Sequence, residues 1–266
     1  MLRIKNNFDL KSTITCGQIF RYEIIDNKYI VILKDRVISL EIDNDYIIIK
    51  SNKSDNLKEV IYEYFDLNRD YNVIINELKE KNKDIKYNEG LRIINGNPYE
   101  VIISYIISQN NRVPSIKKSL DLISKYGEEV IFEGKKYNLF PSIDVLKTLK
   151  IEDIRNFKVG FRDKYLYDII NSDFDYNKIY NMDTKEALKY LMSYKGIGIK
   201  VASCILLFSY KRLDVFPIDT WVKKYMKDEY NIEGIKNIEK FSYENYGMYS
   251  GLVLQYMFDY KRNGGK

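Results

Sequence analysis

Residues 191–210, LMSYKGIGIKVASCILLFSY, contain the pattern that decides the fold of the central part of the chain. A helix is expected to end before Gly196-Ile197-Gly198, and a second helix to begin directly after this turn. The two glycines allow the chain to fold back on itself, while Ile197 anchors the turn in the core. The backbone N–H groups at the start of the second helix then form an anion site suited to one phosphate group. A plain hairpin of two helices has the same pattern, so the turn alone does not establish a function.

Lys200 lies two residues after the second glycine, at the start of a helix expected to run to about Tyr210. The positive end of the helix dipole disfavours the ammonium form there, and so does burial. A lysine nucleophile needs a neutral amine, so the position suits catalysis. Most lysines in a Lys-rich chain are nevertheless solvated surface charges, and Lys200 alone does not identify an enzyme.

A third element follows at residues 216–220, FPIDT. Pro217 breaks the chain, and Asp219 is expected to cap a new helix over residues 220–228. Asp219 comes 19 residues after Lys200, a separation that fits one helix and a returning loop. A carboxylate brought back beside the lysine would stabilise the positive charge that develops on a sugar during cleavage of a glycosidic bond. A helix cap with no other role is the simpler interpretation of Asp219 alone.

The composition excludes several classes of function. The 266 residues are 45% hydrophobic and 30% charged, as in an ordinary globular protein, and the net charge of +5 permits nucleic-acid binding without arguing for it. The absence of histidine excludes His-based acid–base chemistry and nearly all catalytic zinc sites. Two cysteines, Cys16 and Cys204, cannot hold an iron–sulfur cluster or form a disulfide framework. The chain begins without an apolar leader and no apolar run reaches about 18 residues, so we expect a cytoplasmic, nucleoid-associated protein with no membrane partner.

The pattern along the chain predicts an α+β fold. Four short runs rich in β-branched and aromatic residues, separated by turn-forming residues, predict an antiparallel meander within residues 19–50. After Ser51 the pattern is helical and is expected to remain so to the end. We predict an N-terminal antiparallel β domain, residues 1–88, packed on a mostly α-helical region, residues 89–266, that contains the helix-hairpin-helix motif. The last helix, about 251–262, is expected to pack back on the N-terminal domain.

Taken together, Gly196-Ile197-Gly198, Lys200 and Pro217-x-Asp219 resemble the helix-hairpin-helix-GPD superfamily of base-excision DNA glycosylases. Further segments resemble specifically its 8-oxoguanine DNA glycosylase/AP lyase branch. They are CGQIFRY at 16–22, ISQNN at 107–111, FPS at 140–142, GFR at 160–162, and YSG at 249–251 with Phe258. The resemblance spans nearly the whole chain in order, which chance matching would not produce.

This resemblance implies a metal-free, cofactor-free bifunctional enzyme that acts as a monomer on double-stranded DNA containing oxidised guanine. In such enzymes the damaged nucleotide is flipped out of the duplex into a pocket. Lys200 would attack the sugar C1′, expel the base and form a Schiff base, after which β-elimination nicks the strand. Asp219 would stabilise the cationic transition state and cap its helix.

The resemblance also implies which residues surround the base. The carbonyl of Gly17 would accept the N7–H that only the oxidised base has, while Cys204 and Phe258 would sandwich the ring. Without the family, Cys204 and Phe258 equally suit ordinary core packing. Pro217 and Gln255 are assigned to the same pocket. The family's glutamine that reads the Watson–Crick edge falls at Leu254, one position before Gln255, so either side chain is a candidate to face the base.

The residues implied to contact the duplex form a second group. Asn110 would fill the hole left by the flipped nucleotide, Phe161 would act as an aromatic wedge, and Arg162 would bond the orphaned opposite base. Gly196 and Gly198 would hold a phosphate, and Trp221 stands where animal enzymes have a phosphate-contacting histidine. An arginine that reads the opposite cytosine in animal enzymes is replaced by Ser115, which predicts relaxed preference for the opposite base.

Two alternatives remain open at this level. A related glycosylase for another lesion, such as an alkylated or mispaired base, would share most of these motifs. A non-catalytic helix-hairpin-helix DNA-binding module would keep only the hairpin. The presence of both Lys200 and Asp219 argues against the second alternative, because phosphate binding requires neither side chain.

Overall fold

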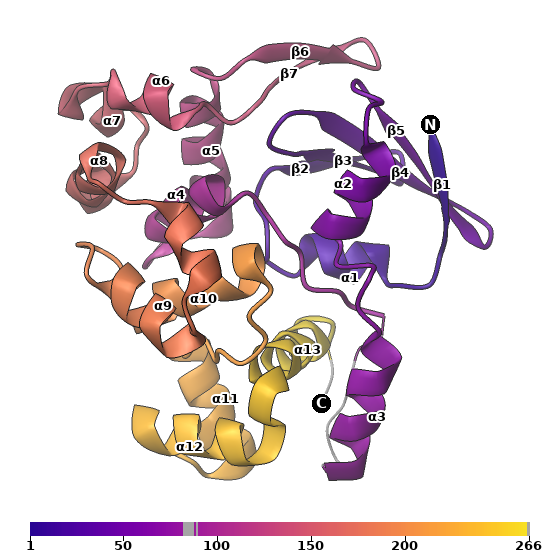
Figure 1. The fold of residues 1–266 in the computed structure, drawn as a ribbon, viewed down its shortest axis with the longest axis vertical. Coiled ribbons are helices and arrows are strands. Elements are labelled where there is room, and N and C mark those ends of the chain that lie inside the picture. The colour runs from indigo at the N-terminus through magenta and orange to yellow at the C-terminus, as the bar shows by residue number, and fades with distance from the viewer. Residues whose placement is uncertain (82–87, 89, 265–266) are drawn as a thin grey trace.

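An antiparallel sheet of five strands forms the N-terminal side of the molecule (Figure 1). The structure is a computed structural model that describes residues 1–81, 88 and 90–264. The strands lie in the order β1-β5-β4-β3-β2, with bounds β1 Leu2–Lys5, β2 Tyr22–Ile25, β3 Lys28–Ile32, β4 Val37–Asp43 and β5 Tyr46–Ser51. The predicted meander of four strands is confirmed as β2 to β5. Strand β1 was not predicted, because its four residues bury only Ile4 and their partner β5 lies more than 40 residues later.

Both faces of the sheet are covered. On one face, alternate strand residues such as Val31, Leu40 and Ile49 form a core with helices α1 (Leu10–Thr15) and α2 (Leu57–Tyr64). On the other face, Ile30 and Val37 pack against Phe132, Tyr137 and Leu139. A sheet buried on both sides is expected to show runs of apolar residues, and KYIVI in β3 is one.

The second face is covered by a hairpin that corrects the prediction of helix from Ser51 to the end. Strands β6 (Glu129–Phe132) and β7 (Lys135–Asn138) pair antiparallel around Glu133 and Gly134. Both turn residues have positive φ, 47° and 77°, as the tight hairpin turns require. Each strand has only four residues, and their apolar side chains pack on a sheet more than 90 residues earlier in the sequence, so local periodicity did not reveal them.

Helices form the remainder of the described chain, and the two most deeply buried, α4 and α10, pack against each other at its centre. The longer helices are α3 Tyr71–Lys81, α4 Pro98–Ser108, α5 Val113–Ser124, α8 Asp163–Asn171, α9 Thr184–Met192, α10 Ile199–Tyr210, α11 Thr220–Tyr230, α12 Ile235–Tyr246 and α13 Ser250–Arg262. Short helices α6 (Ile143–Lys147) and α7 (Ile151–Asn156) complete the set, with 3₁₀ turns at Gly160–Arg162, Tyr176–Asn181 and Gly247–Tyr249. The α+β fold class is therefore confirmed.

Local signals in the sequence account for several helix starts. Asn97 caps α4 with its side chain and Pro98 occupies the first turn. At α9, Asp183 accepts from the amide of Glu186 at 2.8 Å, while the Glu186 carboxylate accepts from the amide of Asp183 at 3.1 Å. This is the reciprocal capping box that the spacing predicts.

The C-terminal helix α13 returns to the N-terminal segment beside α1 (Figure 1). The side chain of Gln255 donates to the carbonyl of Cys16 at 3.0 Å, and Arg262 donates to the carbonyl of Thr15. A buried ion pair of 3.3 Å between Arg21 and Glu100 joins the segment before β2 to helix α4. Residue 89, which begins the predicted helical region, lies outside the described residues, and the division at 88 and 89 stays a prediction.

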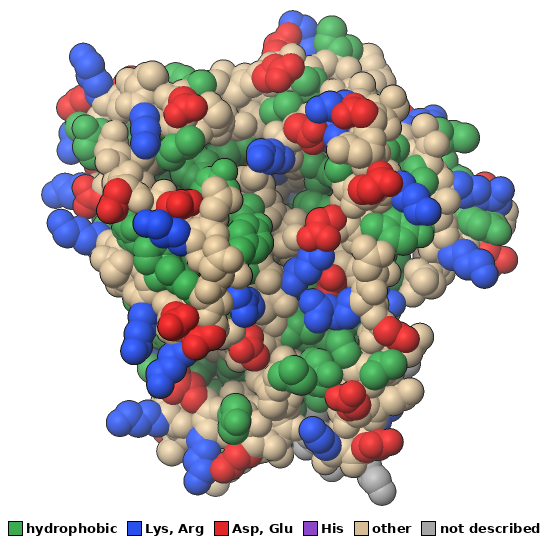
Figure 2. Space-filling model, viewed as in Figure 1, with side chains coloured by type: hydrophobic (Ala, Val, Ile, Leu, Met, Phe, Trp, Pro, Cys, Tyr) green, Lys and Arg blue, Asp and Glu red, His purple; other side chains and the backbone are tan. Residues whose placement is uncertain are grey.

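Acidic and basic side chains are interspersed on the face shown in Figure 2, in keeping with the small net charge. Across the described ranges, none of the helices combines the length and the apolar character that a membrane span requires.

Candidate active site

The predicted hairpin is formed by α9, the turn at Gly196-Ile197-Gly198 and α10. Gly196 has φ +82°, and a Cβ added there would lie 2.7 Å from Cβ of Tyr165 and closer still to its ring. Ile197 is buried, as expected of an anchor. Gly198 is the N-cap of α10, and a Cβ added there would meet only open space. The start of α10 therefore presents its first-turn amides at an open surface, as an anion site requires.

A cavity of about 260 Å³ brings together eight of the residues singled out from the sequence, together with Leu254. These eight are Gly17, Lys200, Cys204, Pro217, Asp219, Trp221, Gln255 and Phe258. They come from five separate parts of the chain: the turn after α1, helix α10, the loop before α11, helix α11 and helix α13. We call this cavity the base pocket.

A larger groove of about 850 Å³ adjoins the base pocket. Its walls include Asn110, Ser115 and Gly198, and it shares Lys200, Asp219 and Trp221 with the base pocket. The two candidate catalytic side chains therefore stand where the groove meets the pocket.

Lys200 lies in the first turn of α10 and is partly buried. Its Nζ is 5.4 Å from the ring centroid of Tyr105, a cation–π distance. Burial raises the pKa of the Cys204 thiol, the nearby Lys200 ammonium opposes that shift, and the Asp219 carboxylate adds to it. Lys200, Cys204 and Asp219 all line the base pocket, so the amine and the carboxylate border the same space.

Asp219 is the N-cap of α11, as the sequence predicts. Its Oδ1 accepts from the amide of Val222 at 2.9 Å. This hydrogen bond fixes the carboxylate at the N-terminus of the helix. Asp219 thus caps α11 and also lines the base pocket. Its role as a helix cap is therefore compatible with a role in stabilising charge on a substrate.

The aromatic wall of the base pocket is formed by Phe258 and Trp221. Their rings meet edge to face with centroids 5.1 Å apart, and Trp221 stacks on Tyr225 at 5.1 Å. Gly17 lies opposite, with φ +87°, and a Cβ added there would sit 3.9 Å from Cε1 of Phe258. Phe258 is partly exposed, whereas residues 250–257 before it in α13 are buried, and its side chain lines the base pocket.

Both Leu254 and Gln255 line the base pocket, which leaves the choice between them open. Leu254 is also buried in a cluster with Ile218, Val222 and Met226. The amide of Gln255 is held beside the Gly17 turn by its hydrogen bond to Cys16.

On the groove side, Asn110 is exposed and has φ +47°, directly after the end of α4. Phe161 is 59% exposed, and it lines neither the groove nor the base pocket. Arg162, by contrast, is buried, and its guanidinium donates to the carbonyls of Gln109 at 2.8 Å, Val159 at 2.9 Å and Asn110 at 3.0 Å. In this structure Arg162 therefore holds the backbone that carries Asn110.

Two residues at the site were not singled out from the sequence. Gln109 donates from its side chain to the carbonyl of Gly196 at 2.9 Å, and its own carbonyl accepts from Arg162, so it connects the hairpin turn to the Asn110 segment. Tyr105 lines the base pocket and contacts both Lys200 and Gly17. Gln109 stands within the quoted segment ISQNN, whereas Tyr105 lies in a helix so uniformly apolar that nothing in the pattern distinguishes it.

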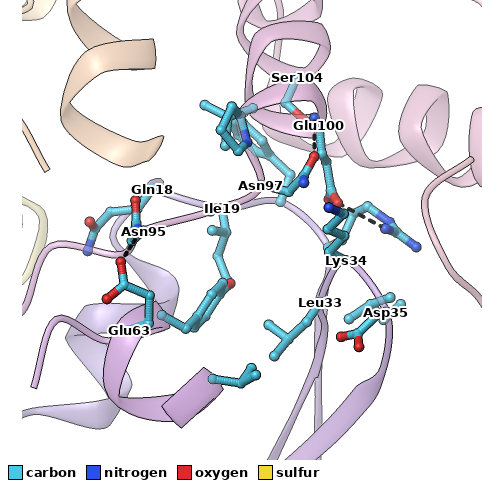
Figure 3. A pocket seen from close by; sticks show the side chains of 18 of the residues that line it. Gln18, Ile19, Leu33, Lys34, Asp35, Glu63, Asn95, Asn97, Glu100 and Ser104 are labelled. Carbon is cyan, nitrogen blue, oxygen red and sulfur yellow. Dashed lines mark hydrogen bonds and ion pairs between the residues drawn. The ribbon is translucent and has the colours of Figure 1, made fainter. Parts of the chain in front are cut away.

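A separate cavity of about 470 Å³ lies between the sheet and α4 (Figure 3). Gln18, Ile19, Leu33, Asn97 and Ser104 are among its walls. It shares Phe20 and Tyr105 with the base pocket, so these two aromatic side chains separate the two spaces. Within the described ranges, no three Cys, Asp or Glu side chains come together as a metal-binding group.

Comparison with known proteins gives matches over nearly the whole chain. Residues 1–102 match the family model for the N-terminal domain of 8-oxoguanine DNA glycosylase. A probable N-glycosylase/DNA lyase of Methanothermobacter thermautotrophicus is 28% identical over 237 residues, covering 79% of this chain and 76% of that protein.

Two solved structures extend the similarity to the complete fold. MBOgg1 in complex with a low-affinity DNA ligand has a TM-score of 0.92 and 34% identity, covering 99% of this chain and 94% of that one. The 8-oxoguanine glycosylase/lyase of Clostridium acetobutylicum, in complex with double-stranded DNA containing cytosine opposite 8-oxoguanine, has a TM-score of 0.90 and 36% identity. That match covers 98% of this chain and 93% of that one.

Proposed function

Since this chain belongs to the 8-oxoguanine DNA glycosylase/lyase family, we propose that it excises 8-oxoguanine from double-stranded DNA and nicks the strand at the abasic site. The observation that carries this proposal is the base pocket, which is lined by Lys200, Asp219, Gly17, Cys204 and Phe258. The pocket opens into a groove that begins at the helix hairpin. An enzyme that extrudes a base from the duplex needs a pocket for the base and an adjoining surface for the DNA strand.

Lys200 is proposed as the nucleophile. Its amine forms a bond to C1′ of the extruded sugar while the bond from C1′ to the base breaks and the base leaves with the electron pair. Loss of a proton from the new ammonium and opening of the ring then give a Schiff base between Nζ and C1′. Abstraction of a proton from C2′ and departure of the 3′ phosphate complete the β-elimination.

Asp219 is proposed to stabilise the sugar as it gains positive charge. Its carboxylate lines the same pocket as Lys200 and is fixed by the amide of Val222, so little reorganisation would be needed during the reaction.

The base is proposed to bind between Cys204 and Phe258, with its N7–H donated to the carbonyl of Gly17. Guanine has a lone pair at N7 in place of this N–H. Its N7 and the carbonyl oxygen of Gly17 would then be two acceptors facing each other with no proton between them, so no hydrogen bond could form. Pro217 and either Gln255 or Leu254 complete the pocket around the other edges of the ring. A fixed polar contact of this kind discriminates better than pocket size does.

The duplex is proposed to lie along the groove. The amides that follow Gly196 and Gly198 would hold one phosphate, with the indole N–H of Trp221 as a further donor. Asn110, which lines the groove, would fill the vacated stack, and the exposed Phe161 would act as the wedge. Arg162 would support Asn110 through its backbone contacts and would reach the orphaned base only by exchanging one of them.

We further propose that the protein acts as a monomer, without metal or cofactor, on chromosomal DNA in the nucleoid. The pocket described here is complete within one chain, since the described residues supply the nucleophile, the carboxylate and both aromatic walls.

Borohydride trapping tests this function. Protein and duplexes carrying 8-oxoguanine opposite each of the four bases are mixed with sodium borohydride, which reduces the Schiff base to a stable covalent adduct. We expect an adduct with the wild type and none with Lys200→Gln. Lys147→Gln, an exposed lysine in α6, is the matched control and should trap like the wild type. Activity on another lesion, with no adduct on any 8-oxoguanine duplex, would overturn the substrate assignment.

A further inference from the structure

Four successive backbone carbonyls, those of residues 15–18, each accept a hydrogen bond from a side chain of the helical region. The donors are Arg262 for Thr15, Gln255 for Cys16 at 3.0 Å, and the Tyr105 hydroxyl, which is 3.1 Å from the oxygen of Gly17 and 3.3 Å from that of Gln18. The turn at Gly17 is therefore held from outside, by groups more than 80 residues away in sequence.

Tyr105 is itself held firmly. It is buried in α4, its ring stacks on Phe208 with centroids 5.5 Å apart, and Phe20 contacts its edge at 5.8 Å. Lys200 places its Nζ 5.4 Å from the same ring. One side chain thus contacts both Lys200, the proposed nucleophile, and Gly17, whose carbonyl is the proposed acceptor for the base.

The hydroxyl of Tyr105 stabilises the orientation of the Gly17 carbonyl, because it donates to the oxygens of both Gly17 and Gln18. Two carbonyl oxygens that face one point repel each other, and a shared hydroxyl proton offsets this repulsion. Burial raises the pKa of Tyr105 well above its usual value, so the hydroxyl keeps its proton throughout the physiological range. A carbonyl oxygen has two lone pairs, so the Gly17 oxygen can accept from Tyr105 and from the base together.

We propose that Tyr105 is a positioning residue that directs the Gly17 carbonyl at the base and thereby sets the preference for a base with a proton at N7. This inference rests on the proposed function, in which that carbonyl receives the N7–H of 8-oxoguanine. An abasic site has no N7–H, so the hydroxyl should matter for excision of the base and not for the lyase reaction at a ready-made abasic site.

Tyr105→Phe removes the hydroxyl and keeps the ring against Phe208 and Lys200. We expect single-turnover excision of 8-oxoguanine to slow by about tenfold, the loss typical of one oriented hydrogen bond. Borohydride trapping on a duplex with a preformed abasic site should stay within about twofold of the wild type.

Tyr99→Phe is the matched control, because Tyr99 lies in the same helix, is buried, and has a hydroxyl with no hydrogen-bond partner among the residues that the structure describes. It should leave both reactions unchanged.

A binding measurement adds a direct test of discrimination between 8-oxoguanine and guanine. In the Lys200→Gln background, adding Tyr105→Phe should lower the ratio of affinities for 8-oxoguanine and guanine duplexes by about tenfold.

Two outcomes would overturn the inference. Excision by Tyr105→Phe at the wild-type rate would show that the Gly17 carbonyl needs no such support. Equal loss of excision and of abasic-site trapping would show that the hydroxyl serves Lys200 or the fold instead of the carbonyl. Failure of the proposed function has a different signature, namely a wild-type protein that does not excise 8-oxoguanine at all.

Discussion

The active site contains two glycine turns that use opposite halves of the peptide group. The turn at Gly17 directs carbonyl oxygens toward its neighbours, whereas the turn at Gly196 and Gly198 directs amides toward the groove. Gly17 and Gly196 have nearly the same φ, +87° and +82°. Both glycines thus have a left-handed φ, and the two turns differ in the side chains that surround them.

The surroundings differ in how they hold the two turns. The carbonyls of residues 15–18 are tied by three side chains, and a Cβ at Gly17 would meet only one atom, 3.9 Å away. The hairpin turn is instead held by close packing, since Gly196 lies against the ring of Tyr165 and Ile197 is buried. Recognition of one atom of a base needs an acceptor with a fixed direction, while a phosphate is satisfied by any cluster of open donors.

The largest expected effect is that of Gly196→Ala. The new Cβ would overlap Tyr165 and would occupy a left-handed backbone conformation, so we expect a loss of about 3 kcal/mol in the free energy of unfolding. Urea denaturation measures it. Gly198→Ala is the control, because its φ is −89° and its Cβ meets open space; its loss should stay within about 1 kcal/mol. Equal losses would show that packing does not distinguish the two glycines.

Gly17→Ala should have a smaller effect on stability and a specific effect on excision. Backbone strain should cost about 1–2 kcal/mol, and the added methyl would enter the space beside Phe258. We expect excision of 8-oxoguanine to fall about 30-fold, with trapping on a preformed abasic site retained.

Gly134→Ala provides the comparison for Gly17→Ala. Gly134 has φ +77° in the hairpin between β6 and β7, and its Cβ would meet nothing within 4 Å. The strain is therefore similar and the site is untouched. If Gly134→Ala lowered excision as much as Gly17→Ala, the effect would come from general destabilisation and the distinction between the two turns would fail.

The comparison of the two turns also shows how far sequence alone leads. The hairpin was predictable in detail, because turn, anchor and helix start are local: α10 begins at Ile199 and ends at Tyr210, as the pattern indicates. The site residues could be nominated by resemblance, and the structure places eight of them around one cavity.

The sequence does not reveal which residues far apart in the chain contact each other in the fold. Nothing near Gly17 predicts that Tyr105 donates to it, since the two are 88 residues apart and Tyr105 is one apolar position among many in α4. Strand β1 and the hairpin β6–β7 were missed for the same reason, because each consists of four-residue strands stabilised by distant partners. The sequence around Arg162 likewise does not indicate that its guanidinium donates to three backbone carbonyls, two of which lie more than 50 residues away.

A third prediction concerns the groove, along which the duplex is proposed to lie. Ser115 lines the groove with Asn110, and we expect the wild type to excise 8-oxoguanine at comparable rates opposite cytosine and adenine. Ser115→Arg adds a side chain able to contact the opposite base and should raise the preference for cytosine by about tenfold. Ser115→Ala should leave the ratio unchanged. A strong preference for cytosine in the wild type would contradict the inference from Ser115.

The smallest expected effect lies in the Gly17 turn itself and depends on pH. Burial raises the pKa of the Cys16 thiol from its usual 9.0 to about 12. Between these values the unfolded chain releases a proton that the folded protein keeps, so stability conferred by Cys16 is complete below pH 9 and is lost as the pH rises toward 12. Cys16→Ser removes this ionisation and retains a donor for the carbonyl of Thr13. Urea denaturation at pH 8 and pH 10 should therefore show the wild type losing about 1 kcal/mol more than Cys16→Ser over that interval. Parallel losses would mean that the thiol is accessible to water, and that the Gly17 turn is held less tightly than its four bonded carbonyls indicate.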